Sequence, residues 1–124
     1  MDVYAVLVNK GLEYEIDQLI AGSPEDWPKF RMGKGWDGIT PPTKTITALV
    51  TEIAVDQTDI VFTKLSQTSY KVVCSLPLAA GFEDTVNEIG IFNDAGDLQI
   101  YGVFTDQSKT NSNEMTFSFT IELG

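Results

Sequence analysis

The clearest alternation of apolar and polar residues lies at residues 115–123. Every second residue of this segment is apolar, and threonine, serine and glutamate fill the positions between. Because successive side chains of a β-strand point to opposite faces, this pattern predicts a strand with one buried and one solvent-facing side. Residues 59–65 and 70–76 also predict strands, and Pro77 ends the second of these because it has no backbone N–H to donate.

A β-hairpin is predicted in the second half of the chain. Two apolar-rich runs, residues 89–92 and 98–104, flank a short polar turn that contains Asp94, Gly96 and Asp97. Glycine supplies the positive φ angle of a tight hairpin turn, and aspartate can hydrogen-bond its own turn. The hairpin therefore predicts antiparallel sheet as the main architecture.

Helical periodicity is confined to the first half of the chain. Apolar residues recur at helical spacing among acidic residues over residues 11–21, which predicts an amphipathic helix capped by Gly22. Residues 43–55 predict one or two helical turns leading into a strand. Residues 3–8 fit a strand or the lead-in to a helix, and residues 29–32 alternate as a short strand. The expected fold class is α+β, with a short N-terminal helical part followed by a mainly antiparallel β-sheet with a central hairpin.

Length and composition indicate one domain over residues 1–124. A chain of this size can bury a core without disulfides. Cys74 is the sole cysteine and lies in a strand-like run, which favours a buried, inert thiol. No apolar run approaches the roughly 20 residues that cross a bilayer, so we expect no membrane span. The N-terminus also lacks the basic start of a signal peptide.

Charge and residue usage exclude several classes of function. The formal charge of −10, with eight lysines and arginines, argues against nucleic-acid binding, which needs clustered basic residues. The chain has no histidine, which excludes a histidine-dependent triad, a histidine general base and a His-ligated zinc site. Residues 33–42 contain three glycines but lack the Gly-Lys-Ser/Thr of a phosphate-binding loop, so they predict a surface loop. We expect no cofactor.

Paired carboxylates offer the nearest approach to catalytic chemistry. Asp94 and Asp97 belong to the predicted turn, where solvent keeps both ionised and no cleft is implied. The same turn lacks the alternating ligands and distal glutamate of a calcium loop. Glu88 enters the hairpin beside Ile89, and we expect it to hydrogen-bond backbone or pair with Arg31 or a lysine. The weakest hypothesis is a hydrolase that uses Glu88 and Asp94.

Aromatic and apolar residues are the candidates for contact with other molecules. An alternative hypothesis is a small carbohydrate-binding module that uses Trp27, Trp36 and nearby acids, with or without calcium. Tryptophan and tyrosine are also enriched where proteins contact each other. The candidate interface residues are Trp27, Trp36, Ile89, Phe92, Tyr101 and Phe104.

Several motifs, in order along most of the chain, carry a family resemblance. They are an Asn-x-Gly before the predicted helix (residues 9–11), a strand running into Gly-x-Gly (residues 30–35), the segment at residues 45–53, and Glu-Ile-Gly-Ile-Phe, a turn and Gly-x-Leu within residues 87–98. The chain resembles the N-terminal, baseplate-attaching domain of bacteriophage tail fibre (tail-collar) proteins. It has no internal repeat and stops where a fibre shaft would continue, so we expect either a stand-alone attachment module or the attachment domain alone of a longer protein.

This resemblance implies a non-enzymatic structural protein of a phage tail or tail-derived particle. Its expected role is that of an adaptor that attaches fibre or receptor-binding components to the baseplate. The implied partners are baseplate, tail and tail fibre proteins, together with further copies of the chain, with a trimer favoured. The implied location is the virion tail or baseplate, after synthesis in the cytoplasm of the bacterial host.

Overall fold

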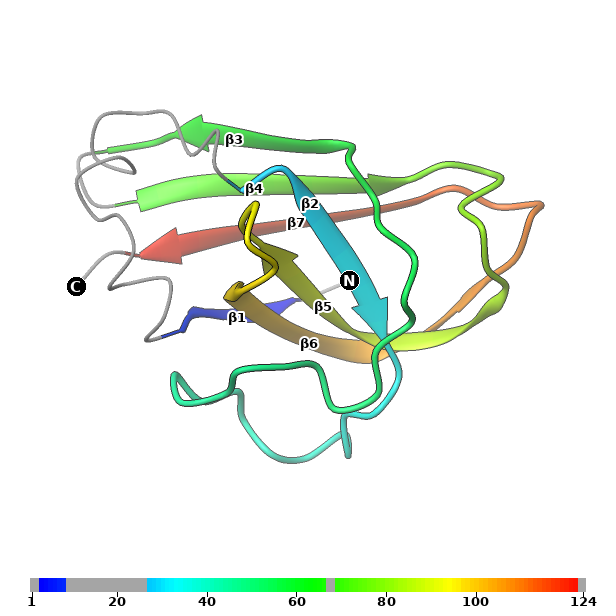
Figure 1. The fold of residues 1–124 in the computed structure, drawn as a ribbon, viewed down its shortest axis with the longest axis horizontal. Helices are drawn as coiled ribbons and strands as arrows, with labels where there is room; N and C mark the ends of the chain where they lie inside the picture. Colours follow the sequence, from blue (N-terminus) through cyan, green and yellow to red (C-terminus); the bar gives the residue numbers. More distant parts are fainter. Residues whose placement is uncertain (1–2, 9–26, 67–68, 123–124) are drawn as a thin grey trace.

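The described residues contain seven β-strands, which form two antiparallel sheets that lie face to face (Figure 1). The computed structural model describes residues 3–8, 27–66 and 69–122. The strands are β1 (Tyr4–Leu7), β2 (Lys29–Gly33), β3 (Ile60–Lys64), β4 (Ser69–Leu76), β5 (Asp84–Phe92), β6 (Leu98–Lys109) and β7 (Met115–Glu122). One sheet has the order β1-β6-β5-β2 and the other the order β3-β4-β7. The described part of the chain is therefore a β-sandwich.

The predicted fold class, α+β, is wrong for the described residues, which form strands, turns and irregular chain but no helix. The predicted helix at residues 11–21 lies outside the described residues. The helical turns predicted at residues 43–55 are absent: the bond from the N–H of Ile46 to the carbonyl of Thr43 (3.5 Å) closes one turn, and several backbone groups from residue 50 onward bond to other segments. Ile53 donates to the carbonyl of Met32 (2.9 Å), and Gln57 exchanges two hydrogen bonds with Phe30 (2.9 Å each). An extended segment thus covers the outer edge of β2.

The strand predictions in the second half of the chain are confirmed. β5 and β6 form the predicted hairpin, and Gly96 in its turn has φ +86°. Asn93 holds this turn, since its side-chain oxygen accepts a hydrogen bond from the N–H of Asp97 (2.8 Å). β4 ends at Leu76, as Pro77 predicts. However, β6 continues to Lys109, five residues beyond the apolar-rich run that predicted it.

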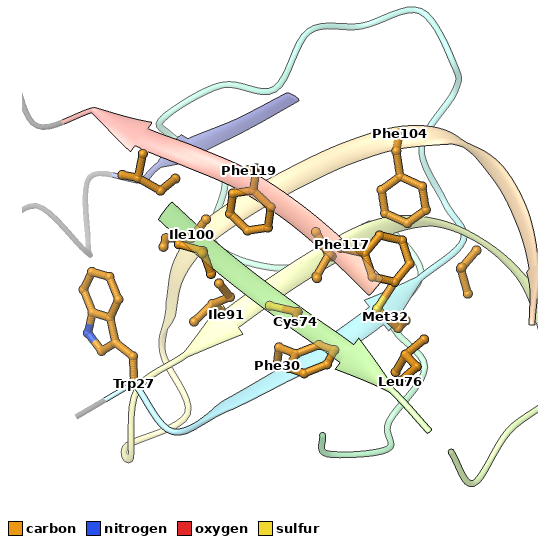
Figure 2. Packing of buried hydrophobic residues seen from close by; sticks show 14 of the residues in the cluster. Trp27, Phe30, Met32, Cys74, Leu76, Ile91, Ile100, Phe104, Phe117 and Phe119 are labelled. Carbon is orange, nitrogen blue, oxygen red and sulfur yellow. The ribbon is translucent and has the colours of Figure 1, made fainter. Parts of the chain in front are cut away.

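The main core lies between the two sheets (Figure 2). Alternate residues of β7 enter it, with Phe117, Phe119 and Ile121 buried and the residues between them exposed. Phe117 lies against Phe104 of the opposite sheet, with ring centroids 4.7 Å apart. Cys74 is buried here as predicted, and desolvation raises the pKa of its thiol. The alternating pattern of the sequence therefore specifies the interior of the sandwich.

A third layer covers the outer face of the four-stranded sheet (Figure 1). It is formed by residues 34–51, which we call the covering loop. Leu49 of this loop is buried, and Trp36 and Ile46 pack beside it. They cover a second apolar cluster of the sheet, which contains Val8, Phe92, Leu98, Tyr101 and Val103. The four-stranded sheet is thus buried on both faces.

Candidate functional site

One buried carboxylate joins the covering loop to the sheet. Glu88 has no exposed surface and lies in β5. Its Oε1 atom accepts hydrogen bonds from the backbone N–H groups of Gly35 (2.8 Å) and Thr51 (3.2 Å). Its Oε2 atom accepts from the N–H of Val50 (2.9 Å) and from the hydroxyl of Tyr101 (2.5 Å). The four donors satisfy a carboxylate that would otherwise be strongly unfavourable in the interior.

Of the two roles expected for Glu88, hydrogen bonding to backbone is the one that the structure shows, and the alternative partner Arg31 bonds elsewhere. Arg31 instead pairs with Glu52 (2.8 Å) and Asp56 (2.6 Å) at the edge of the sheet. Glu88 lies in the middle of β5, directly opposite Gly33 of β2. The carboxylate is therefore a central anchor rather than a charge at the margin of a strand.

An irregularity in the β5–β6 pairing directs two consecutive side chains toward the covering loop. The register shifts between Val86 and Glu88, so Asn87 is not paired in the regular ladder. The Asn87 side-chain oxygen accepts from the N–H of Trp36 (3.2 Å), and its nitrogen donates to the Trp36 carbonyl (3.0 Å) and to Asp106 (3.1 Å). Neighbouring residues of a regular strand face opposite sides, so the shift explains how Asn87 and Glu88 bind the same loop.

Two glycines allow the close approach that these hydrogen bonds need. A Cβ atom at Gly35 would lie 2.6 Å from the backbone nitrogen of Thr51, and one at Gly33 would lie 2.7 Å from Oε1 of Glu88. Contacts this short are not tolerated without backbone movement. The Gly-x-Gly sequence therefore serves the contact with Glu88 and not a phosphate.

The fourth donor to Glu88 is the hydroxyl of Tyr101, which lies beneath the covering loop. Burial raises the pKa of its hydroxyl, and the hydrogen bond to Glu88 raises it further. Above about pH 10, the ordinary pKa of tyrosine, the unfolded chain loses a proton that the folded chain retains. The contribution of Tyr101 to stability is therefore complete below about pH 10 and decreases as the pH rises.

This linkage gives a prediction for alkaline solution. The free energy of unfolding, measured by urea titration between about pH 8 and pH 11, should decrease at the alkaline end. The decrease should be smaller in Tyr101→Phe, and the part due to the buried thiol of Cys74, whose pKa is also raised, should remain. An equal decrease in Tyr101→Phe and the wild type would contradict the assignment.

A hollow of about 350 Å³ lies on the outer side of this anchor. Most of its wall belongs to the covering loop, and Tyr101 contributes from the sheet. The side chains that matter for its chemistry are Trp36, Asp37, Ile46, Val50 and Tyr101, together with two consecutive prolines at positions 41 and 42. The hollow is thus mainly aromatic and aliphatic, and it opens to solvent.

The polar groups around the hollow are engaged within the chain. The indole N–H of Trp36 donates to the carbonyl of Thr40 (2.7 Å). Asp37 Oδ1 accepts from the N–H groups of Ile39 (2.8 Å) and Thr40 (2.7 Å), and its Oδ2 accepts from the Thr40 hydroxyl. These bonds, of which that from the Thr40 hydroxyl has the largest effect, lower the pKa of Asp37 and keep it ionised.

The candidate interface residues of the sequence fall into two groups. Trp27, Ile89 and Phe104 are buried in the core between the sheets. Phe92 and Tyr101 are buried beneath the covering loop, and Trp36 of the loop is partly exposed. The structure therefore brings Trp36 and Tyr101 together at the hollow and places the other four in intramolecular packing.

The two aspartates of the hairpin turn, Asp94 and Asp97, are exposed and lie apart from Glu88. Sequence reasoning did not identify Val50 or Thr51 as partners of Glu88, or Asn87 as a second residue that binds the covering loop. One signal was available: Asn87 and Glu88 lie between the apolar residues Val86 and Ile89, and buried polar groups require hydrogen-bond partners.

Three further findings concern metal ligands, membrane-spanning helices and similarity to known proteins. Within residues 3–8, 27–66 and 69–122, no group of three or more histidine, cysteine or carboxylate residues is arranged to hold a metal ion. The described part of the chain has no helix that could span a bilayer. Comparisons with protein-family models, with curated protein sequences and with solved structures each found no match to this chain.

Proposed function

We propose that this protein is a non-enzymatic adaptor of a phage tail or tail-derived particle that joins fibre or receptor-binding components to the baseplate. The observation that supports this most is the position of the family-like motifs. Residues 30–35, 45–53 and 87–98 lie far apart in the sequence, yet all three supply groups to the Glu88 anchor. Three short motifs that meet at one buried residue support the family resemblance more strongly than motifs that lie apart in the structure would.

The arrangement of the strands supports self-association of such an adaptor. β3 and β7 are the outer strands of the three-stranded sheet, and neither has a second strand partner among the described residues. Val61 on β3 is 54% exposed. Outer strands with apolar residues are natural points of contact between protein subunits. We propose that copies of the chain associate around a symmetric axis, as a trimer.

The alternative function, a carbohydrate-binding module, would use two tryptophans, but one of them is not accessible. Trp27 is 2% exposed and lies edge-on against Phe62, with ring centroids 6.2 Å apart. Its ring is therefore not available to stack on a sugar. Trp36 remains at the surface, but its indole N–H is already bonded to Thr40. The adaptor remains the function that these side chains support best.

The proposal predicts that the chain is a component of tail particles. Particles purified from a bacterium that produces the chain should contain it by mass spectrometry, and gold-labelled antibody should mark the baseplate end. Native mass measurement of the purified chain should give a trimer. Absence of the chain from intact particles would overturn the adaptor function, whereas a monomeric chain inside particles would overturn only the self-association.

A further inference from the structure

The covering loop presents an apolar surface around the hollow. Val50, which lines the hollow, is 63% exposed, and Ile39 of the same loop is 84% exposed. Exposed aliphatic side chains gathered beside an aromatic-lined hollow are typical of protein contact sites. The volume of about 350 Å³ lies near the lower end of the range of roughly 300–1,000 Å³ for ligand pockets. A hollow of this size can hold one side chain of a partner molecule.

The hydrogen bonds around the hollow decide what kind of group it can receive. A sugar needs several free donors and acceptors at fixed positions. Here the Trp36 N–H is bonded to Thr40, and both oxygens of Asp37 accept bonds from its own loop. The Tyr101 hydroxyl donates inward to Glu88. The wall therefore offers mainly apolar contact, which favours an apolar side chain over a carbohydrate.

Charge gives a second constraint on the partner. Among the described residues that line the hollow, Asp37 is the one that is ionised at neutral pH. The whole chain carries a formal charge of −10. A field of this sign attracts positively charged partners and opposes acidic ones. The complementary group is thus an apolar side chain that lies next to a lysine or arginine.

We propose that the hollow receives an apolar side chain of a partner protein in the tail particle, carried beside a basic residue that faces Asp37. This inference rests on the proposed adaptor function and names the docking surface and the chemistry of the partner. Shape and apolar contact in the hollow provide the affinity, and the charge pair at its rim sets the orientation.

The test uses full-length variants expressed in a strain that lacks the gene, with the amount of chain in purified particles as the readout. Val50→Arg fills the hollow and places a positive charge against the basic partner residue. We expect incorporation to fall at least about tenfold, as for the loss of a central interface contact. Leu78→Arg is the matched control, since it adds the same charge at an exposed aliphatic residue that lies outside the covering loop and outside the outer strands β3 and β7.

The outcomes separate the two proposals. If the wild-type chain is absent from the particles, the adaptor function fails. If the wild type is present and Val50→Arg is incorporated as well as Leu78→Arg, the docking surface at the hollow is wrong. Urea unfolding of both arginine variants checks that they are equally stable, so that a difference in incorporation reports binding and not folding. A glycan array completes the test, because sugar binding that Val50→Arg abolishes would overturn the assignment of an apolar protein side chain.

Discussion

Replacing Glu88 with glutamine is expected to lower the free energy of unfolding by about 3 kcal/mol. The Glu88 carboxylate accepts four hydrogen bonds, three of them from backbone N–H groups of the covering loop. A glutamine side chain has the same size but only one acceptor oxygen, and its NH₂ group would face at least one of these donors. A buried donor without an acceptor costs roughly 1–3 kcal/mol, and hydrogen bonds to a charged group are stronger than neutral ones.

Urea unfolding at neutral pH measures this effect. Glu114→Gln is the matched control, because Glu114 is exposed and its substitution removes the same charge. The control should unfold within about 0.5 kcal/mol of the wild type. If Glu88→Gln were equally stable, the four hydrogen bonds would not contribute to holding the covering loop, and the anchor assigned to Glu88 would be wrong.

A second large effect is expected for Gly35→Ala, about 2 to 3 kcal/mol of lost stability. The added methyl group would lie 2.6 Å from both the backbone nitrogen and the hydroxyl oxygen of Thr51. The backbone cannot yield locally, because the N–H groups of both Gly35 and Thr51 are bonded to Glu88. The loop must therefore move away from the carboxylate to relieve the contact.

Gly38→Ala distinguishes this steric effect from the general effect of removing a glycine. Gly38 has φ +82°, and no atom lies within 4 Å of the position that a Cβ atom would take, so its substitution strains the backbone without a collision. That strain costs about 1 kcal/mol. Equal losses of stability in the two variants would show that the covering loop does not approach Thr51 as closely as the structure has it.

The strands of the second half of the chain could largely be predicted from the sequence, because several of them follow a simple alternation, whereas their division into two sheets was not predicted. Residues 115–123 predict β7 correctly since every second residue enters the core, and residues 89–92 and 98–104 predict the hairpin. The extent of β6 could not be predicted this way. Its last residues are polar, yet they pair with Asp84 and Thr85 of β5. Lys109, the final residue of β6, is buried and donates to the carbonyls of Leu78 and Thr110.

The covering loop shows where periodicity fails as a guide. Four apolar residues recur at helical intervals at the end of the covering loop and just beyond it, but their surroundings differ. They are Ile46, Leu49, Val50 and Ile53. Leu49 is buried on the sheet, Val50 is exposed, and the backbone N–H of Ile53, beyond the loop, bonds to β2. The segment is extended because Glu88 and β2 supply its hydrogen-bond partners. These partners lie far away in the sequence, so no local pattern could reveal them. The sequence indicates hydrogen bonds between Glu88 and backbone groups, but only the three-dimensional structure shows that the donors are the N–H groups of residues 35, 50 and 51.

The distance along the chain between Glu88 and its loop partners has a consequence for synthesis. The hydrogen bonds to Gly35, Val50 and Thr51 span 53, 38 and 37 residues. On the ribosome, which produces the N-terminal part first, the loop segment emerges well before the residue that fixes it. Its apolar side chains remain uncovered until the hairpin has been made and paired. The newborn protein is therefore most prone to aggregate during this interval, and its final layer closes only after the second half of the chain exists.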